Sequence, residues 1–175
     1  MKFQLAAFAD EADSRLVNQI TAMTENGISY LEIRGVDGEN IADISQKARE
    51  IRMQLDASSL KVWSLRSPFG KIGIEDDFAP HLETFKRSLE IADILGTKHI
   101  RMFSFYLPAG KTRQDCRGEV MDKLGAMLDL ADAFDVKLCH ENEGEIYGET
   151  PEQCLDLMET FNGRLGCVFD MGNFA

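Results

Sequence analysis

Hydrophobic and polar residues alternate along the chain in two patterns. Short runs rich in β-prone residues predict strands, and between them apolar residues recur every three or four positions, as on one face of a helix. After the first run, for example, Leu16, Ile20 and Met23 form such a stripe. The patterns predict strands at 3–9, 30–36, 61–65, 99–105, 136–140 and 166–169, with helices at 13–26, 41–55, 78–95 and 116–134 and a last helix from Thr150 onward.

Strands that alternate with helices indicate a parallel sheet covered by helices, which a doubly wound sheet and a (β/α)8 barrel both satisfy. Polar residues repeatedly occupy one parity of the strands, which favours a barrel with a polar inner face. A full barrel needs about 250 residues, and only six of its eight strands are present. The predicted fold class is α/β, an incomplete TIM-barrel type formed as a single domain over 1–175. The polar positions are Glu32, Arg34, Ser64, Arg66, Arg101, Glu141 and Asp170.

Composition and charge narrow the functional classes. The chain is 44% hydrophobic and 28% charged, and no apolar run reaches membrane-spanning length. We see no signal peptide and expect a cytoplasmic protein without a membrane partner. The net charge of −11 counts against nucleic-acid binding. The four cysteines form no Cys-x-x-Cys pair, so we expect free thiols.

Active sites of parallel barrels lie at the carboxyl ends of the strands. Glu141 and Asp170 end two successive strands, and paired carboxylates suit a divalent ion such as Mg²⁺ or Mn²⁺. Such an ion can lower the cost of forming an enediolate. We expect substrate to contact other residues at these strand ends, namely Arg34, Lys71, Arg101, Tyr147 and Asn173.

Each of these residues also has a structural interpretation. An acid at a strand end is more often a helix cap or an ion-pair partner. Arg34 and Arg101 could pair with acids of the inner face, Lys71 could be a surface lysine, and Glu143 could lie in a solvated loop. His140 has the opposite parity to Glu141 and is expected to pack outward. The sequence lacks both a Gly-x-Gly-x-x-Gly phosphate loop and a Gly-x-Ser-x-Gly nucleophile elbow.

Several motifs together resemble the sugar phosphate isomerase/epimerase family, within the xylose isomerase-like TIM-barrel superfamily. The similarity is carried by His140-Glu141-Asn142-Glu143 with Ile146-Tyr147-Gly148, and by Phe169-Asp170-Met171-Gly172-Asn173-Phe174. Earlier segments look like the first four strands of that family in order. They are Ala7-Phe8-Ala9-Asp10-Glu11, Leu31-Glu32-Ile33-Arg34-Gly35-Val36, Ser67-Pro68-Phe69-Gly70-Lys71 and Arg101-Met102-Phe103-Ser104-Phe105.

The resemblance implies a divalent metal (Mn, Mg, Co or Zn) held by a Glu and an Asp on the fifth and sixth strands, here Glu141 and Asp170. It also implies a catalytic role for Glu141 in moving a proton beside the carbonyl of a sugar or sugar phosphate. The family's seventh and eighth strands usually add a His and a Glu, whereas this sequence stops after the sixth strand. We therefore expect a fragment with little activity alone and a tendency to form homo-oligomers.

Two other functions stay open at this point. The chain could be a non-catalytic, barrel-derived module for sugar binding or assembly, without a metal. An endonuclease IV-like nuclease is less favoured, because the chain is acidic and its three histidines are poorly placed for a zinc cluster.

Overall fold

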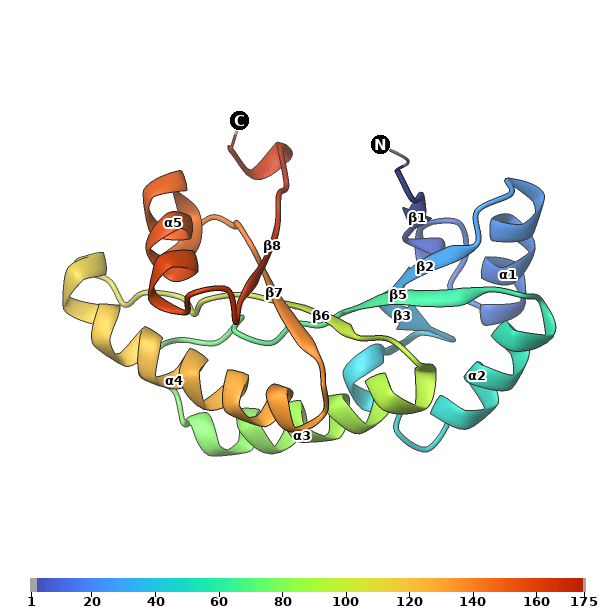
Figure 1. The fold of residues 1–175 in the computed structure, drawn as a ribbon, viewed down its shortest axis with the longest axis horizontal. Coiled ribbons are helices and arrows are strands. Elements are labelled where there is room, and N and C mark those ends of the chain that lie inside the picture. Colours follow the sequence, from blue (N-terminus) through green and yellow to red (C-terminus); the bar gives the residue numbers. More distant parts are fainter. Residues whose placement is uncertain (1–2, 175) are drawn as a thin grey trace. The chain divides into compact units, whose positions relative to one another are not determined.

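The computed structural model describes residues 3–174 as strands and helices in alternation (Figure 1). Contacts divide the chain into two compact units. Unit 1 contains the chain up to Ser67 together with Arg87–Ile100, and unit 2 contains Pro68–Lys86 together with the chain from Arg101 onward. The prediction that 1–175 form a single domain stays a prediction.

Unit 1 is built on parallel strands that follow one another in chain order. Ala6 lies opposite Tyr30, and Glu32 lies opposite Ser64 beyond an irregularity in the register after Leu31. Helices α1 and α2 and the second half of α3 supply the apolar faces that bury these strands. The strands are β1 (Ala6–Ala7), β2 (Tyr30–Ile33), β5 (Lys61–Arg66) and the start of β6 (His99–Met102), and the helices are η1 (Ala9–Glu11), α1 (Leu16–Glu25), α2 (Ala48–Ala57) and α3 (Phe78–Leu95).

A small hairpin in unit 1 departs from the prediction. The expected strand over 30–36 divides into β2 and β3 (Gly35–Val36), and β3 pairs antiparallel with β4 (Glu39–Asn40). Asp37 and Gly38 between them have φ of 52° and 82°, the left-handed values that a tight hairpin turn requires. The expected helix over 41–55 begins late for this reason. A 3₁₀ turn, η2 (Ile41–Asp43), follows the hairpin and precedes α2.

Unit 2 contains the end of β6 and the next two parallel strands, again in chain order. Glu141, the last residue of β7, lies opposite Val168, the last residue of β8. Helix α4 begins three residues earlier than predicted, because Thr112 and Asp115 form a capping box. The elements are β7 (Lys137–Glu141), β8 (Gly166–Val168), α4 (Arg113–Ala133), α5 (Pro151–Thr160), η3 (Tyr147–Glu149), η4 (Gly172–Phe174) and the first half of α3.

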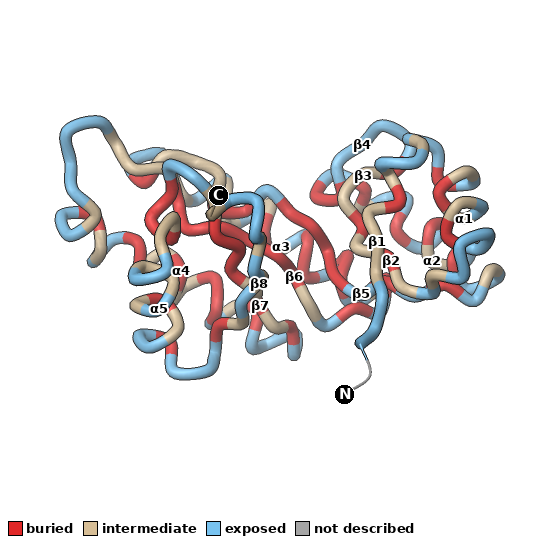
Figure 2. Tube along the Cα trace, turned by 90° about the horizontal axis from the view of Figure 1, so that it is seen from above, coloured by how far each residue is buried: buried red, intermediate tan, exposed pale blue. Residues whose placement is uncertain are grey.

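Burial follows the two patterns seen in the sequence, with buried residues on the strands and on one side of each helix (Figure 2). In unit 1 the core includes Leu31, Leu65 and Leu89, and in unit 2 it includes Phe85 and Leu138. Six parallel strands that alternate with helices confirm the predicted fold class. Two strands fewer than the eight of a closed barrel confirm that the fold is incomplete.

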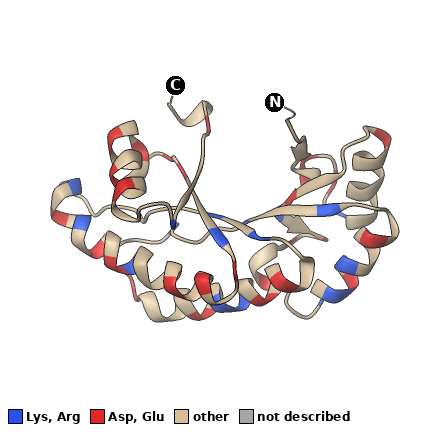
Figure 3. Ribbon diagram, viewed as in Figure 1, with Lys and Arg blue, Asp and Glu red and all other residues tan. Residues whose placement is uncertain are grey.

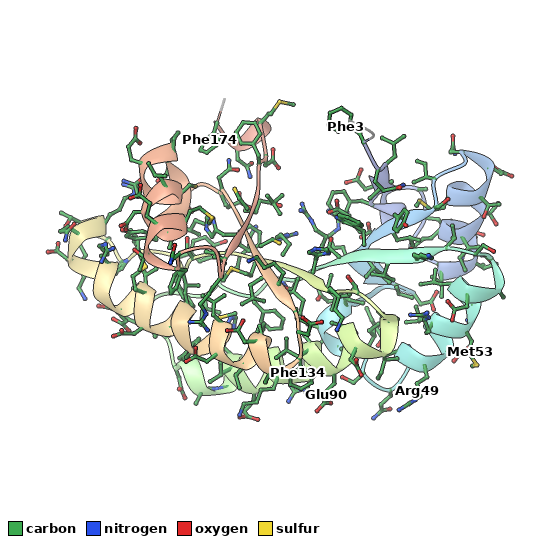
Figure 4. All side chains as sticks on the ribbon, viewed as in Figure 1. Phe3, Arg49, Met53, Glu90, Phe134 and Phe174 are labelled. Carbon is green, nitrogen blue, oxygen red and sulfur yellow. The ribbon has the colours of Figure 1, made fainter. Side chains whose placement is uncertain are left out.

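Charged residues occur mainly on the helices, with a few on the strands (Figure 3). Scattered apolar side chains are also exposed, among them Phe3 near the N-terminus and Met53 on α2, both labelled in Figure 4. All four cysteines are free thiols, as predicted. No helix within residues 3–174 is long and apolar enough to cross a membrane.

Candidate functional site

The candidate site is built on the carboxyl ends of β6, β7 and β8 in unit 2. Glu141 ends β7, and only 5% of its side chain is exposed. Its Oε2 atom lies 3.6 Å from Nε of Arg101 on β6, whose side chain is 10% exposed. The polar parity predicted from the sequence thus places a buried carboxylate beside a buried guanidinium.

The ring of Phe103 brings a second cation to the same place. The guanidinium carbon of Arg101 lies 4.3 Å from the ring centroid, and Nζ of Lys71 lies 4.2 Å from it. Nζ of Lys71 also donates to Oε2 of Glu143 at 2.7 Å. The ring of Phe103 thus lies between two ion pairs, Arg101 with Glu141 and Lys71 with Glu143.

Gly70 fixes the loop that carries Lys71. Its φ is +84°, and a Cβ atom at this position would lie 2.1 Å from the carbonyl oxygen of Phe103. The N–H of Gly70 donates to Nε2 of His81 at 3.0 Å, and the N–H of Phe103 donates to the carbonyl of Phe69 at 2.7 Å. Only glycine accepts this backbone conformation and this close approach together.

Asp170 follows β8 and is joined to the end of β7 through Asn142. The side-chain amide of Asn142 donates from Nδ2 to the carbonyl of Asp170 at 2.9 Å and accepts from its N–H at 2.9 Å. Asn173 in turn donates from Nδ2 to the carbonyl of Asn142 at 2.8 Å. The structure thus ties Asp170 and Asn173 to the residue that follows Glu141.

His140, which precedes Glu141 on β7, is fully buried. Its Nε2 atom is 2.9 Å from Oγ of Ser104, and the same hydroxyl accepts the N–H of Gly148 at 2.8 Å. Burial lowers the pKa of His140 to about 3, so its imidazole is neutral. This position matches the expectation that His140 packs away from Glu141.

Tyr147 lies apart from this group. Its ring is buried, and its hydroxyl donates to Oδ2 of Asp156 on α5 at 2.6 Å. Burial raises the pKa of Tyr147 to about 12, and the hydrogen bond to Asp156 is the second largest cause of this rise. Asp156 also pairs with Arg117 of α4, so this cluster joins η3 to two helices.

Arg34 belongs to unit 1, where it has a site of its own. Its Nε donates to Oδ2 of Asp10 at 2.8 Å, and its Nη2 lies 3.5 Å from Oε1 of Glu11. The hydrogen bond to Asp10 is the main reason that the pKa of Arg34 is raised. Asp10, Arg34 and the hairpin of β3 and β4 line a cavity of about 360 Å³.

The site in unit 2 offers two carboxylates to a metal, Glu141 and Asp170. Divalent ions take oxygen ligands of this kind, with the rest of the shell often water. No group of three or more His, Cys, Asp or Glu residues suited to one ion forms in the described part of the chain.

Sequence reasoning missed three residues of the site. Phe103, Asn142 and Glu143 all lie between or beside predicted site residues, yet Phe103 and Asn142 were given no role and Glu143 was assigned to a solvated loop. Their positions in the sequence could have indicated them, because all three lie within two residues of the end of β6 or β7. Which side chains meet there depends on the register of neighbouring strands.

The sequence profile of the xylose isomerase-like TIM barrel family matches residues 20–175. The chain belongs to this family. Curated protein sequences give no match. The family assignment confirms the resemblance seen in the sequence motifs, and it agrees with the parallel strands and the polar strand ends described above.

Solved structures with this fold extend the comparison. The apo form of the 3-keto-D-glucoside 4-epimerase YcjR from E. coli is 14% identical, with a TM-score of 0.78, over 99% of this chain and 70% of that one. The IolI protein with bound zinc is 20% identical, with a TM-score of 0.80, over 97% and 63%. The probable 3-DHS dehydratase AsbF from Bacillus anthracis is 16% identical, with a TM-score of 0.80, over 99% and 64%. The chain thus spans roughly two thirds of the length of these proteins, and at these identities the likeness concerns the fold.

Proposed function

We propose that this chain carries part of the active site of a divalent-metal-dependent isomerase or epimerase acting on sugars or sugar phosphates. The observation that carries the proposal is Glu141, a buried carboxylate at the end of β7 that faces Arg101 and is tied through the next residue to Asp170. A carboxylate in this position can take a proton from a carbon beside a carbonyl and return it. The family assignment and the epimerase among the solved relatives support this choice.

Arg101 beside Glu141 and Lys71 beside Glu143 supply positive charge that suits such a reaction. Proton removal beside a carbonyl forms an enediolate, whose negative charge is stabilised by fixed positive groups. Arg101 and Lys71 are both held against the ring of Phe103 within 4.3 Å of its centroid. We assign them, with Asn173, to contacts with the substrate oxygens. Arg34 and Tyr147 are also proposed to contact substrate, although their hydrogen-bond partners are Asp10 and Asp156 rather than Glu141.

Glu141 and Asp170 would hold the metal, whether Mn, Mg, Co or Zn. When bound, a divalent ion polarises a carbonyl oxygen and so makes the neighbouring proton easier to remove. The zinc bound in IolI supports a divalent metal in proteins of this fold. We expect this chain to bind the metal weakly. Only two carboxylates are proposed as ligands, and the described residues offer no group of three or more.

We further propose that the chain is nearly inactive by itself and self-associates. Strand β8 is the last in the strand order, and an edge strand presents unpaired backbone groups that can recruit another chain. Phe169 and Met171 directly after it are 67% and 75% exposed. Sedimentation should show oligomers that dissociate on Phe169→Ser substitution; a strict monomer contradicts this part. A cytoplasmic location is part of the same proposal.

The alternative is a non-catalytic sugar-binding or assembly module, which would need no metal. An endonuclease IV-like activity has less support because of the net charge of −11. Titration of the chain with Mn²⁺ by calorimetry separates the first two. We expect weak binding that Glu141→Gln and Asp170→Asn each abolish, while Glu159→Gln on the exposed side of α5 leaves it unchanged. Equal Mn²⁺ binding by all four proteins contradicts the proposed site.

A further inference from the structure

Asn142 extends the pairing of β7 and β8 beyond the last backbone ladder position. That ladder ends where Glu141 lies opposite Val168. One residue further on, the side chain of Asn142 takes over and forms two hydrogen bonds of 2.9 Å with the backbone N–H and C=O of Asp170. A primary amide donates from its NH₂ group and accepts at its oxygen, so it can bind the N–H and C=O of a neighbouring residue as a strand backbone would.

Two further hydrogen bonds make this connection rigid. Asn173 donates to the carbonyl of Asn142 at 2.8 Å, so the two chain segments bind each other in both directions. The N–H of Gly172 donates to Oδ1 of Asp170 at 2.8 Å and thereby orients the carboxylate itself. Asn142 is 2% exposed, and a buried amide that loses its partners costs more than an exposed one.

We propose that Asn142 is a positioning residue that holds Asp170 in register with Glu141. The three-residue strand β8 ends at Val168, two residues before Asp170, so the ladder itself does not fix the position of this carboxylate. Through the amide of Asn142, Asp170 stays bound to the end of β7 although it lies beyond the last backbone pair of β7 and β8. For its metal-related consequence, the inference rests on the proposed function. Its structural part does not.

Hydrogen exchange of single backbone amides, followed by NMR, tests the structural part. Asn142→Ala removes both the donor to the carbonyl of Asp170 and the acceptor of the Asp170 N–H. We expect the Asp170 amide to exchange about tenfold faster, with that of Cys167 in the ladder unchanged. The matched control is Asn26→Ala, which removes a side-chain hydrogen bond of 2.9 Å to the carbonyl of Ala22 and should leave Asp170 unaffected. An Asp170 exchange rate within twofold of the wild type overturns the proposal.

Broadening of amide signals by Mn²⁺ tests the consequence. In the wild type we expect the signals of Glu141 and Asp170 to broaden over the same range of Mn²⁺ concentration. In Asn142→Ala, which adds no new carboxylate, Asp170 should need about tenfold more Mn²⁺ than Glu141. Joint broadening in the variant, as in the wild type, overturns the proposal. A wild type with a protected Asp170 amide and no broadening contradicts the proposed metal dependence while supporting the positioning role.

Discussion

Each unit places an arginine against a carboxylate at the carboxyl ends of its strands, and the two pairs differ in kind. In unit 1, Arg34 forms a direct hydrogen bond of 2.8 Å with Asp10, and 42% of the arginine side chain is exposed. In unit 2, Arg101 and Glu141 are 3.6 Å apart and at most 10% exposed. The first pair has the geometry of a strong, partly solvated ion pair. The second pair is a buried ion pair, in which Nε of Arg101 lies 3.6 Å from Oε2 of Glu141.

This difference points to different roles. Water screens the charges of the partly exposed pair in unit 1, so that pair interacts weakly with an ion or substrate nearby. A buried carboxylate is screened much less, so a metal ion or a substrate proton beside it interacts with it more strongly. The comparison therefore favours the proposed active site in unit 2 and a structural ion pair in unit 1.

Removing the arginine from each pair should give the largest difference in unfolding free energy between the two units. Arg101→Met leaves Glu141 buried without its cationic neighbour and should cost about 3–5 kcal/mol of unfolding free energy. Arg34→Met acts on a partly exposed pair and should cost below about 1 kcal/mol. Urea unfolding of both variants measures the difference. Adding Glu141→Met to Arg101→Met should recover most of the loss, and equal costs for the two single variants would contradict the contrast.

Replacing Gly70 should weaken the loop that brings Lys71 to the site. Gly70→Ala meets both a left-handed φ and a contact of 2.1 Å with backbone, and should cost roughly 3 kcal/mol or more. Gly110→Ala is the matched control, since Gly110 has the same φ of +84° and open space around it. It should cost roughly 1–2 kcal/mol by the strain of a left-handed alanine alone. Equal losses of stability in thermal unfolding would show that the close approach to Phe103 is absent.

Acid should loosen the same loop through His81, which accepts the N–H of Gly70 and must be neutral to do so. Burial, and less strongly Lys123, lower the pKa of His81 below its ordinary value of 6.5. A lowered folded-state pKa stabilises the fold above pH 6.5, and this contribution is lost as the pH falls through the folded-state pKa. Urea midpoints between pH 7.5 and 5 should fall less in His81→Gln than in the wild type. Parallel slopes would remove His81 from this role.

The ion pair of Lys71 and Glu143 should matter least for stability. Its side chains are 33% and 28% exposed, so Glu143→Gln should cost below about 1 kcal/mol. Urea unfolding measures this cost, with Glu83→Gln, which removes a surface pair on α3, as control. A loss as large as that of Arg101→Met would mean that Glu143, rather than Glu141, is the consequential carboxylate of unit 2.

Much of the fold could be predicted because each strand and helix has a strong hydrophobic pattern of its own. The six strand positions, the polar parity and the outward packing of His140 all follow from local periodicity. The hairpin at Asp37-Gly38 was missed although this dipeptide is a strong turn signal, because the apolar run around it reads as a longer strand. The early start of α4 has a similar cause, since the capping box of Thr112 and Asp115 precedes its first apolar residue.

The site was predictable only in outline. The sequence predicts that Glu141, Asp170, Lys71 and Arg101 lie near one another, because polar residues at the carboxyl ends of parallel strands meet at one edge of the sheet. That Phe103 bears both cations, and that Asn142 binds the backbone of Asp170, depends on strand register and loop closure. Lys71 and Phe103, like Asn142 and Asp170, are far apart in the sequence, and no local pattern encodes their contact. Tyr147 was also predicted from its place after a strand, but its hydroxyl binds Asp156 on helix α5 rather than a residue at a strand end.

The most direct test of the central claim is the location of Mn²⁺ in crystals of the chain soaked with the ion, from anomalous diffraction. We predict a single strong peak within coordination distance of Glu141 and Asp170, about 2.0–2.3 Å from carboxylate oxygens. The peak should vanish in crystals of Glu141→Gln. A peak at Asp10 or Glu39 in unit 1, with none at Glu141, would contradict the account.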